Sequence, residues 1–216
     1  MATLLKKPTL ADLLVSCIPR DLLLAVEEGL TAGAVRAFQA SRGADAGHLP
    51  HVLGQNRHFQ MNEAYHRALE ANGAAPTPIK GSAIITGSAG VFTLGRLNTR
   101  EDVWASARRS QTRRQMAQVN RSIEPLVQAD LFAAAEDPKQ AVAFFVATFS
   151  PSLDLEPAMP VNIELAVPNR SLNKWLFKES LQTFLQRYNA PTKTQHDGAS
   201  PKLKANRKDK KDGTTE

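Results

Sequence analysis

A stretch that is apolar on both faces of a β-strand constrains this chain more than any other feature of its sequence. Residues 141–150 read AVAFFVATFS, with apolar side chains at odd and even positions and no charged residue. Successive side chains of a strand point to opposite faces of a sheet, so this run has no face suited to water. It therefore predicts a central strand of a covered sheet.

Two other segments carry strand patterns. Residues 82–97, SAIITGSAGVFTLGRL, place β-branched or aromatic runs on either side of residues 87–90, and this arrangement predicts a β-hairpin. Residues 161–167, VNIELAV, alternate apolar side chains with polar or small ones, as a half-buried strand does. Together with residues 141–150, these segments predict four strands.

The N-terminal part of the chain has helical patterns. Residues 9–42 predict three short helices. Thr9 can cap the first by accepting a backbone N–H bond, and Pro19 ends it because proline has no N–H to donate. Gly29 is expected to close the second helix and Gly43 the third.

The remaining segments predict a loop, further helices and a tail. Residues 44–55 are expected to form a loop, because glycine and proline interrupt them repeatedly. Helices are expected over residues 57–72, over residues 101–124, and from Asn169 or Ser171 to about Asn189. No apolar periodicity continues beyond residue 189, and such a segment cannot offset its ordering entropy by burial.

These elements predict an α+β fold, with an antiparallel or mixed sheet of about four strands and helices on one or both of its faces. The N-terminal helices, within residues 1–43, are expected to pack on a main domain over residues 44–189. Residues 190–216 are expected to form a disordered basic tail.

Composition narrows the classes of partner and compartment. The net charge is +6, and residues 193–216 hold seven basic and four acidic residues, so half of that charge lies in the tail. Cys17 is the single cysteine, which rules out an intrachain disulfide and favours a reducing, cytoplasmic compartment. No apolar run approaches the roughly 18–20 residues of a membrane helix, so no membrane partner is expected.

The candidate binding residues lie in RRSQTRRQMAQVNR, residues 108–121, which contains no acidic residue. They are Arg108, Arg109, Arg113, Arg114 and Arg121. On a helix, the apolar side would be formed by Trp104, Met116, Val119 and Ile123. Arg113, Arg114 and Arg121 would then face outward. Arg109 would lie at the border, and Arg108 would point into the apolar side.

Guanidinium groups suit phosphate, because they are always charged and can form two parallel hydrogen bonds to it. Neutral donors of the kind that contact nucleic-acid backbones and bases occur in the same segment, at Gln111, Thr112 and Asn120. Two alternatives remain open: a protein partner, and an ion-paired helix face that meets acidic residues such as Glu101, Asp102 or Glu136.

Residues 21–40 also resemble a helix-turn-helix. Small, turn-forming and apolar residues stand at suitable positions, namely Ala25, Gly29, Leu30, Val35 and Phe38. Glu28 occupies a place where an apolar residue is usual, and only Thr31, Arg36 and Gln39 could read base edges. A capped helical hairpin is therefore the favoured interpretation.

Four histidines lie close together in the sequence, at positions 48, 51, 58 and 66. Glu63 and His66 are three residues apart on one predicted helix, which can place two ligands on a metal. No HExxH or other complete metal signature is present, so surface or capping histidines are favoured. No metal or cofactor is expected.

The sequence contains no catalytic motif. Its arginine segment and basic tail predict a non-enzymatic cytoplasmic protein of bacterial type that binds nucleic acid through phosphates. The alternatives are an adaptor or regulatory subunit that binds an acidic protein surface, and a metal-dependent hydrolase that uses His58, Glu63 and His66.

Overall fold

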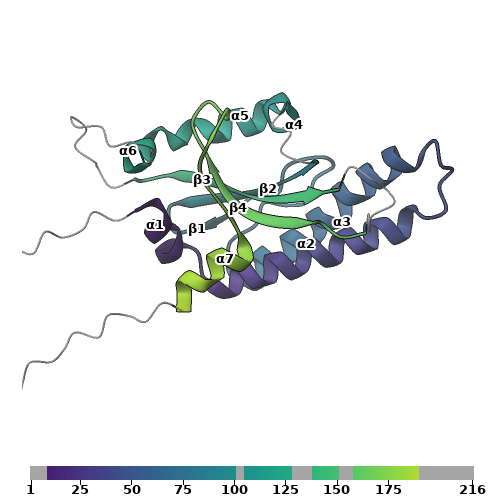
Figure 1. Cartoon of the computed structure of the whole chain (residues 1–216), viewed down its shortest axis with the longest axis horizontal. Helices are drawn as coiled ribbons and strands as arrows, with labels where there is room; N and C mark the ends of the chain where they lie inside the picture. The colour runs from purple at the N-terminus through teal and green to yellow at the C-terminus, as the bar shows by residue number, and fades with distance from the viewer. Residues whose placement is uncertain (1–8, 101–104, 128–137, 151–157, 190–216) are drawn as a thin grey trace, which may run out of the picture.

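A five-stranded mixed sheet forms the middle layer of the fold, with helices on both faces (Figure 1). The computed structural model describes residues 9–100, 105–127, 138–150 and 158–189. The fold is α+β as predicted, with one strand more than the sequence indicated. None of the helices in these ranges is long and apolar enough to cross a membrane.

The strands follow one another across the sheet in chain order. They are β1 (Gly87–Ala89), β2 (Phe92–Arg100), β3 (Ala141–Phe149), β4 (Asn162–Pro168) and β5 (Trp175–Ser180). Strands β2 and β3 run parallel, and every other neighbouring pair is antiparallel. Strand β3 is central, and eight of its nine residues are buried, so the two-sided apolar run predicts its place correctly.

The hairpin is present but its turn lies later than predicted. Strand β1 is formed by three of the four residues expected in the turn, and Gly90 and Val91 connect it to β2. Gly90 has φ +55°, in the left-handed region that suits the first position of a tight two-residue hairpin turn.

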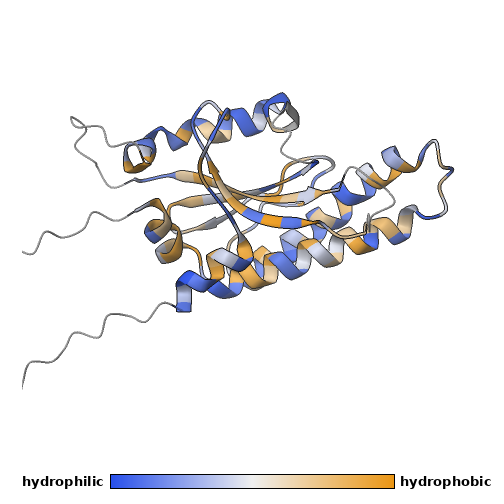
Figure 2. Ribbon diagram, viewed as in Figure 1, coloured by the Kyte–Doolittle hydropathy of each residue, from blue (hydrophilic) through white to orange (hydrophobic). Residues whose placement is uncertain are grey.

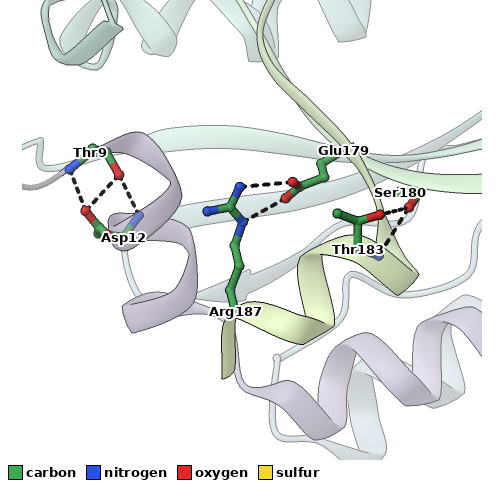
Figure 3. Close-up of polar contacts among 6 residues, drawn as sticks. All are labelled: Thr9, Asp12, Glu179, Ser180, Thr183 and Arg187. Atoms are coloured by element: carbon green, nitrogen blue, oxygen red, sulfur yellow. Dashed lines mark hydrogen bonds and ion pairs between the residues drawn. The ribbon is translucent and has the colours of Figure 1, made fainter. Parts of the chain in front are cut away.

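The predicted C-terminal helix is wrong in its first half. Trp175–Ser180 form β5, which pairs with the edge of β4, and helix α7 (Leu181–Leu185) begins only after it. The Ser180 side chain accepts a hydrogen bond from the Thr183 backbone and caps α7 (Figure 3). A short 3-10 helix, η2 (Gln186–Asn189), follows. Pairing with β4 overrides the local helical spacing.

One face of the sheet is covered by α1 (Leu10–Cys17), α2 (Arg20–Ser41) and α3 (Leu49–Ala71) (Figure 1). Thr9 caps α1 in a reciprocal capping box with Asp12, as drawn in Figure 3. The predicted division of residues 21–42 into two helices is wrong, because α2 is continuous. The predicted loop is also too long, because Leu49–Gln55 already belong to α3.

Gly29 was expected to close a helix, but it lies at a close contact between α2 and α3, as does Gly33. A Cβ at Gly29 would lie 3.2 Å from the Ala64 carbonyl oxygen, and one at Gly33 would lie 2.9 Å from the Gln60 carbonyl oxygen. Both glycines therefore allow α2 and α3 to approach closely and do not end a helix. With no turn at Gly29, both the helix-turn-helix interpretation of residues 21–40 and the favoured helical hairpin are wrong.

The other face is covered by a broken rod, which is α4 (Ala105–Arg109), α5 (Gln111–Ala117), the 3-10 helix η1 (Gln118–Ser122) and α6 (Glu124–Val127). The sequence predicted one helix over residues 101–124. Ser110 has extended backbone angles and caps α5, which separates it from α4. Residues 101–104, with Trp104, lie outside the described ranges. Figure 2 shows that α4 and α5 are largely hydrophilic, whereas β3 is mainly hydrophobic.

The C-terminal end of the described chain is tied to its beginning. Arg187 donates two hydrogen bonds, of 2.8 and 2.9 Å, to the Glu179 carboxylate (Figure 3). The Tyr188 hydroxyl donates to the Ile18 carbonyl, between α1 and α2. The last described residue is Asn189, and the predicted tail, residues 190–216, lies outside the described ranges.

The first prediction tests the close approach of α2 and α3. Gly33→Ala should lower the free energy of unfolding by about 1–3 kcal/mol, because the added methyl group meets backbone and forces the helices apart. Gly54→Ala is the control, since nothing lies within 4 Å of its added Cβ. It should raise stability by up to about 1 kcal/mol. Equal effects in a denaturant melt would contradict the observed packing.

The second prediction concerns the tail. Removing residues 191–216 should change the melting temperature by no more than about two degrees, because the contacts that hold η2 remain. Removing residues 186–216 should lower it clearly, because Arg187 and Tyr188 are lost. A large drop in the shorter truncation would show that the tail contributes to the fold.

Candidate functional site

The structure separates the five predicted arginines. Arg108, Arg109, Arg114 and Arg121 are exposed, whereas Arg113 is only partly exposed. Arg108 was expected to point into the apolar side, and that expectation is wrong. The helical phase is interrupted at Ser110, so the periodicity of the later residues cannot be carried back into α4.

Arg114 and Arg121 line a groove between exposed residues of the rod and the turn that joins β4 to β5. The groove has a volume of about 500 Å³ and is formed by Arg114, Gln118, Arg121, Arg170 and Ser171. The first three come from α5 and η1, and the last two come from the turn between β4 and β5. We call this feature the outer groove. It combines three guanidinium groups with two neutral polar side chains.

Asn120 anchors η1, which carries Gln118 and Arg121 of the outer groove, to the sheet. Its amide nitrogen donates to the carbonyls of Val142 (3.0 Å) and Pro168 (2.7 Å). Its amide oxygen accepts from the Val142 backbone at 2.6 Å. The side chain thus joins η1 to β3 and β4 and is fully buried. The expectation that Asn120 contacts a nucleic acid is wrong, because its donors are already used inside the protein.

Glu124 fixes the opposite wall of the groove. Its carboxylate accepts a 2.9 Å hydrogen bond from the Arg170 backbone and lies 3.7 Å from the Arg170 Nε. This contact holds the β4–β5 turn against the rod and partly neutralises Arg170. Arg114 and Arg121 form no salt bridge with any residue of the described ranges. Two full positive charges therefore remain open to solvent in the groove.

Nothing in the sequence linked Arg170 and Ser171 to the arginines of residues 108–121. They lie about fifty positions further along the chain, and only the return of β4 beside β3 brings their turn to η1. The acidic partners considered for an ion-paired face, Glu101, Asp102 and Glu136, lie outside the described residues.

Arg113 was expected to face outward, and the structure instead turns it inward. Its Nε is buried and has no hydrogen-bond partner among the described atoms. Burial lowers the pKa of Arg113. The positive charge of Arg113 also lowers the pKa of Arg96 and of His58. Arg113 and Arg114 thus belong to different surroundings.

Arg96 is held on the α3 face of the sheet by neutral acceptors. Only 5% of it is exposed. It donates from Nε to Asn62 Oδ1 (2.9 Å), from Nη1 to Asn98 Oδ1 (2.9 Å) and from Nη2 to the His58 carbonyl (2.8 Å). Burial, followed by the charge of Arg113, lowers the pKa of Arg96 to about 9, so the group remains protonated at neutral pH.

His58 takes part in this network as a neutral side chain. Because Asn62 Oδ1 accepts from Arg96, the Asn62 amide nitrogen is the donor in its 3.2 Å contact with His58 Nε2. The His58 proton therefore lies on Nδ1. Burial, then Arg96 and Arg113, lower the pKa of His58 below 6.5. These three effects all favour the neutral ring.

The histidine segment forms no metal site in the described structure. Glu63 lies 3.8 Å from Arg67, and His66 lies 3.9 Å from Glu70, while His58 bonds Asn62. Across the described ranges, no three His, Cys, Asp or Glu side chains are grouped so that they could hold a metal ion. The hydrolase alternative therefore has no supporting cluster there.

The third prediction follows from neutral His58. Its pKa is lower in the folded chain than in the unfolded chain, so the unfolded chain binds more protons below pH 6.5. Stability should fall as the pH drops below that value. The slope is a fraction of the one-proton limit of about 1.4 kcal/mol per pH unit, because the ring is partly solvated. Between pH 5 and 7.5, denaturant melts of His58→Gln should show a flatter profile, and parallel profiles would contradict the assignment.

Three comparisons with known proteins complete the description of the site. No family model matches the chain, no curated protein matches it, and no solved structure matches it.

Proposed function

We propose that this protein binds nucleic acid non-enzymatically through the outer groove, by contacts to the phosphate backbone. The observation that carries the proposal is the convergence of Arg114, Arg121 and Arg170, from two separate segments, on one groove. A polymer of phosphates suits such a groove, because each guanidinium can hold a phosphate with two charge-assisted hydrogen bonds.

The neutral side chains support the same chemistry. Gln118 and Ser171 lie between the arginines and can donate to phosphate or sugar oxygens. Such contacts position a nucleic acid without reading its bases, so binding should depend little on sequence. The exposed Arg108 and Arg109 lie on the preceding helix of the same rod and extend the positive surface.

Rigidity also favours binding at this place. Asn120 and Glu124 fix the rod to two strands and to the β4–β5 turn, so the arginine stems start from a fixed frame. A preformed site loses less conformational freedom on binding than a flexible one. The tail would add nonspecific attraction to polyanions, because residues 193–216 carry a net charge of +3.

The fourth prediction tests the outer groove. Arg114→Gln with Arg121→Gln should weaken binding to every oligonucleotide and reduce the slope of log affinity against log salt by roughly two, since two phosphate contacts are lost. Both side chains are exposed, so stability should change by less than about 0.5 kcal/mol. Binding would be measured by fluorescence anisotropy on duplex and single-stranded DNA and RNA.

Arg67→Gln is the matched control, because Arg67 is an exposed helical arginine on α3, across the sheet from the rod. It should leave the salt slope within about 0.3 of wild type, since no phosphate contact is removed. Absence of binding by the wild-type chain at low salt would remove nucleic acid as the partner. An acidic protein surface would then become the better explanation for the exposed arginines.

A further inference from the structure

The outer groove contains one arginine that is already paired. Arg170 lines the groove together with Arg114 and Arg121, and its Nε lies 3.7 Å from Glu124 Oε2. Among the described residues, Arg114 and Arg121 have no such acidic partner. A ligand that contacts all three arginines must therefore compete with a carboxylate at one of them.

The two oxygens of the Glu124 carboxylate make different contacts. Oε1 accepts a 2.9 Å hydrogen bond from the Arg170 backbone N–H. Oε2 lies 3.7 Å from the guanidinium Nε, which is too far for a hydrogen bond but close enough for an ion pair. One oxygen therefore fixes the backbone of the β4–β5 turn, whereas the other only balances the charge of the side chain.

The β4–β5 turn is also fixed by contacts that do not involve the Arg170 side chain. Asn169 Oδ1 accepts hydrogen bonds from the backbone of Asn173 (3.0 Å) and of Lys174 (3.3 Å). Leu172 is fully buried in the apolar cluster between the rod and the sheet. The Arg170 backbone is thus held from several sides, and its side chain can leave Glu124 while the turn keeps its shape.

The Arg170 side chain is open to a ligand and is only loosely paired. It is 54% exposed, whereas the Glu124 side chain is 18% exposed. An exposed ion pair of this kind is weak, because water and salt screen both charges. A phosphate can form two charge-assisted hydrogen bonds to the same guanidinium, at about 2.8 Å. The distances thus favour exchange of the Glu124 Oε2 contact for a phosphate contact.

We infer, on the basis of the proposed function, that Glu124 determines how strongly the outer groove binds a phosphate backbone. Arg170 stays beside Glu124 Oε2 until a nucleic acid occupies the groove, and its side chain then turns to a phosphate. The nucleic acid gains the Arg170 contact, but the Arg170–Glu124 pair is lost and the carboxylate repels the phosphate. Glu124 is therefore a positioning residue that acts through Arg170 and lowers the affinity of the groove.

Glu124→Gln tests the inference, because it removes the charge and keeps an amide oxygen that can accept from the Arg170 backbone. In the full chain, binding to one DNA duplex should tighten about two- to fivefold at low salt. The slope of log affinity against log salt should become steeper by up to about one. The gain in affinity should shrink as salt rises, because salt screens the carboxylate. Fluorescence anisotropy measures both quantities.

Glu63→Gln is the matched control. Glu63 lies 3.8 Å from Arg67 on α3, so this substitution removes the same charge from an ion pair of nearly equal length, across the sheet from the rod. It should change the affinity by less than about 1.5-fold, since only the net charge differs. Equal tightening by Glu63→Gln and Glu124→Gln would show an effect of net charge alone and would overturn the inference.

Arg170→Gln shows whether Glu124 acts through Arg170. In the Arg170→Gln background, Glu124→Gln relieves only the repulsion of the phosphate, so it should tighten binding less than it does beside Arg170. Equal tightening in both backgrounds would show that Glu124 does not act through Arg170. Arg170→Gln should also weaken binding less than Arg121→Gln, because Arg170 has to leave Glu124 in order to bind. This comparison holds even if Glu124→Gln is less stable than wild type.

Thermal melts separate the effect on binding from damage to the turn. Glu124→Gln should melt within about two degrees of wild type, because the backbone hydrogen bond is kept. Glu124→Ala should melt lower and gain less affinity, because the turn loses this anchor. If wild type binds and Glu124→Gln binds no more tightly, the inference alone is overturned. If wild type binds no oligonucleotide at low salt, the proposed function fails and the inference fails with it.

Discussion

The burial of β3 on both faces is the constraint on which the rest of this structure depends. Its apolar side chains require a layer on each side of the sheet, and the chain supplies α1 to α3 on one face and the rod from α4 to α6 on the other. The rod is the connection between β2 and β3. Because it must also cover β3, its outer side is the only side left for charged residues, apart from Arg113.

A single fully buried side chain sets the geometry of the rod. Asn120 makes three hydrogen bonds to the backbones of β3 and β4 and so fixes where η1 lies and how it is rotated. Arg121 follows it directly and faces the outer groove, with Arg114 two helical turns earlier. The buried, hydrogen-bonded amide of Asn120 thus positions the exposed guanidinium groups that line the groove.

Neighbouring arginines on one short helix have different physical roles. Arg114 is exposed and lines the outer groove, while Arg113 is largely desolvated. The difference arises because adjacent residues of a helix are separated by 100°, and α5 lies between solvent and the sheet. The effect of substituting Arg114 therefore does not predict the effect of substituting Arg113, although the two residues are adjacent in the sequence.

The sequence by itself determined the α+β class, the central strand, the strand over residues 161–167 and the cap at Thr9, because these follow from local periodicity and local hydrogen bonds. It also predicted that Arg114 and Arg121 are exposed, because they lie opposite Met116 and Ile123 on a helix. Only the tertiary structure decided that α2 is continuous past Gly29, that Trp175–Ser180 form a strand, and that Arg170 completes the outer groove. Each of these depends on a partner distant in sequence, namely α3, the edge of β4 and η1. The residue pattern of one segment does not indicate which distant segment it will pack against.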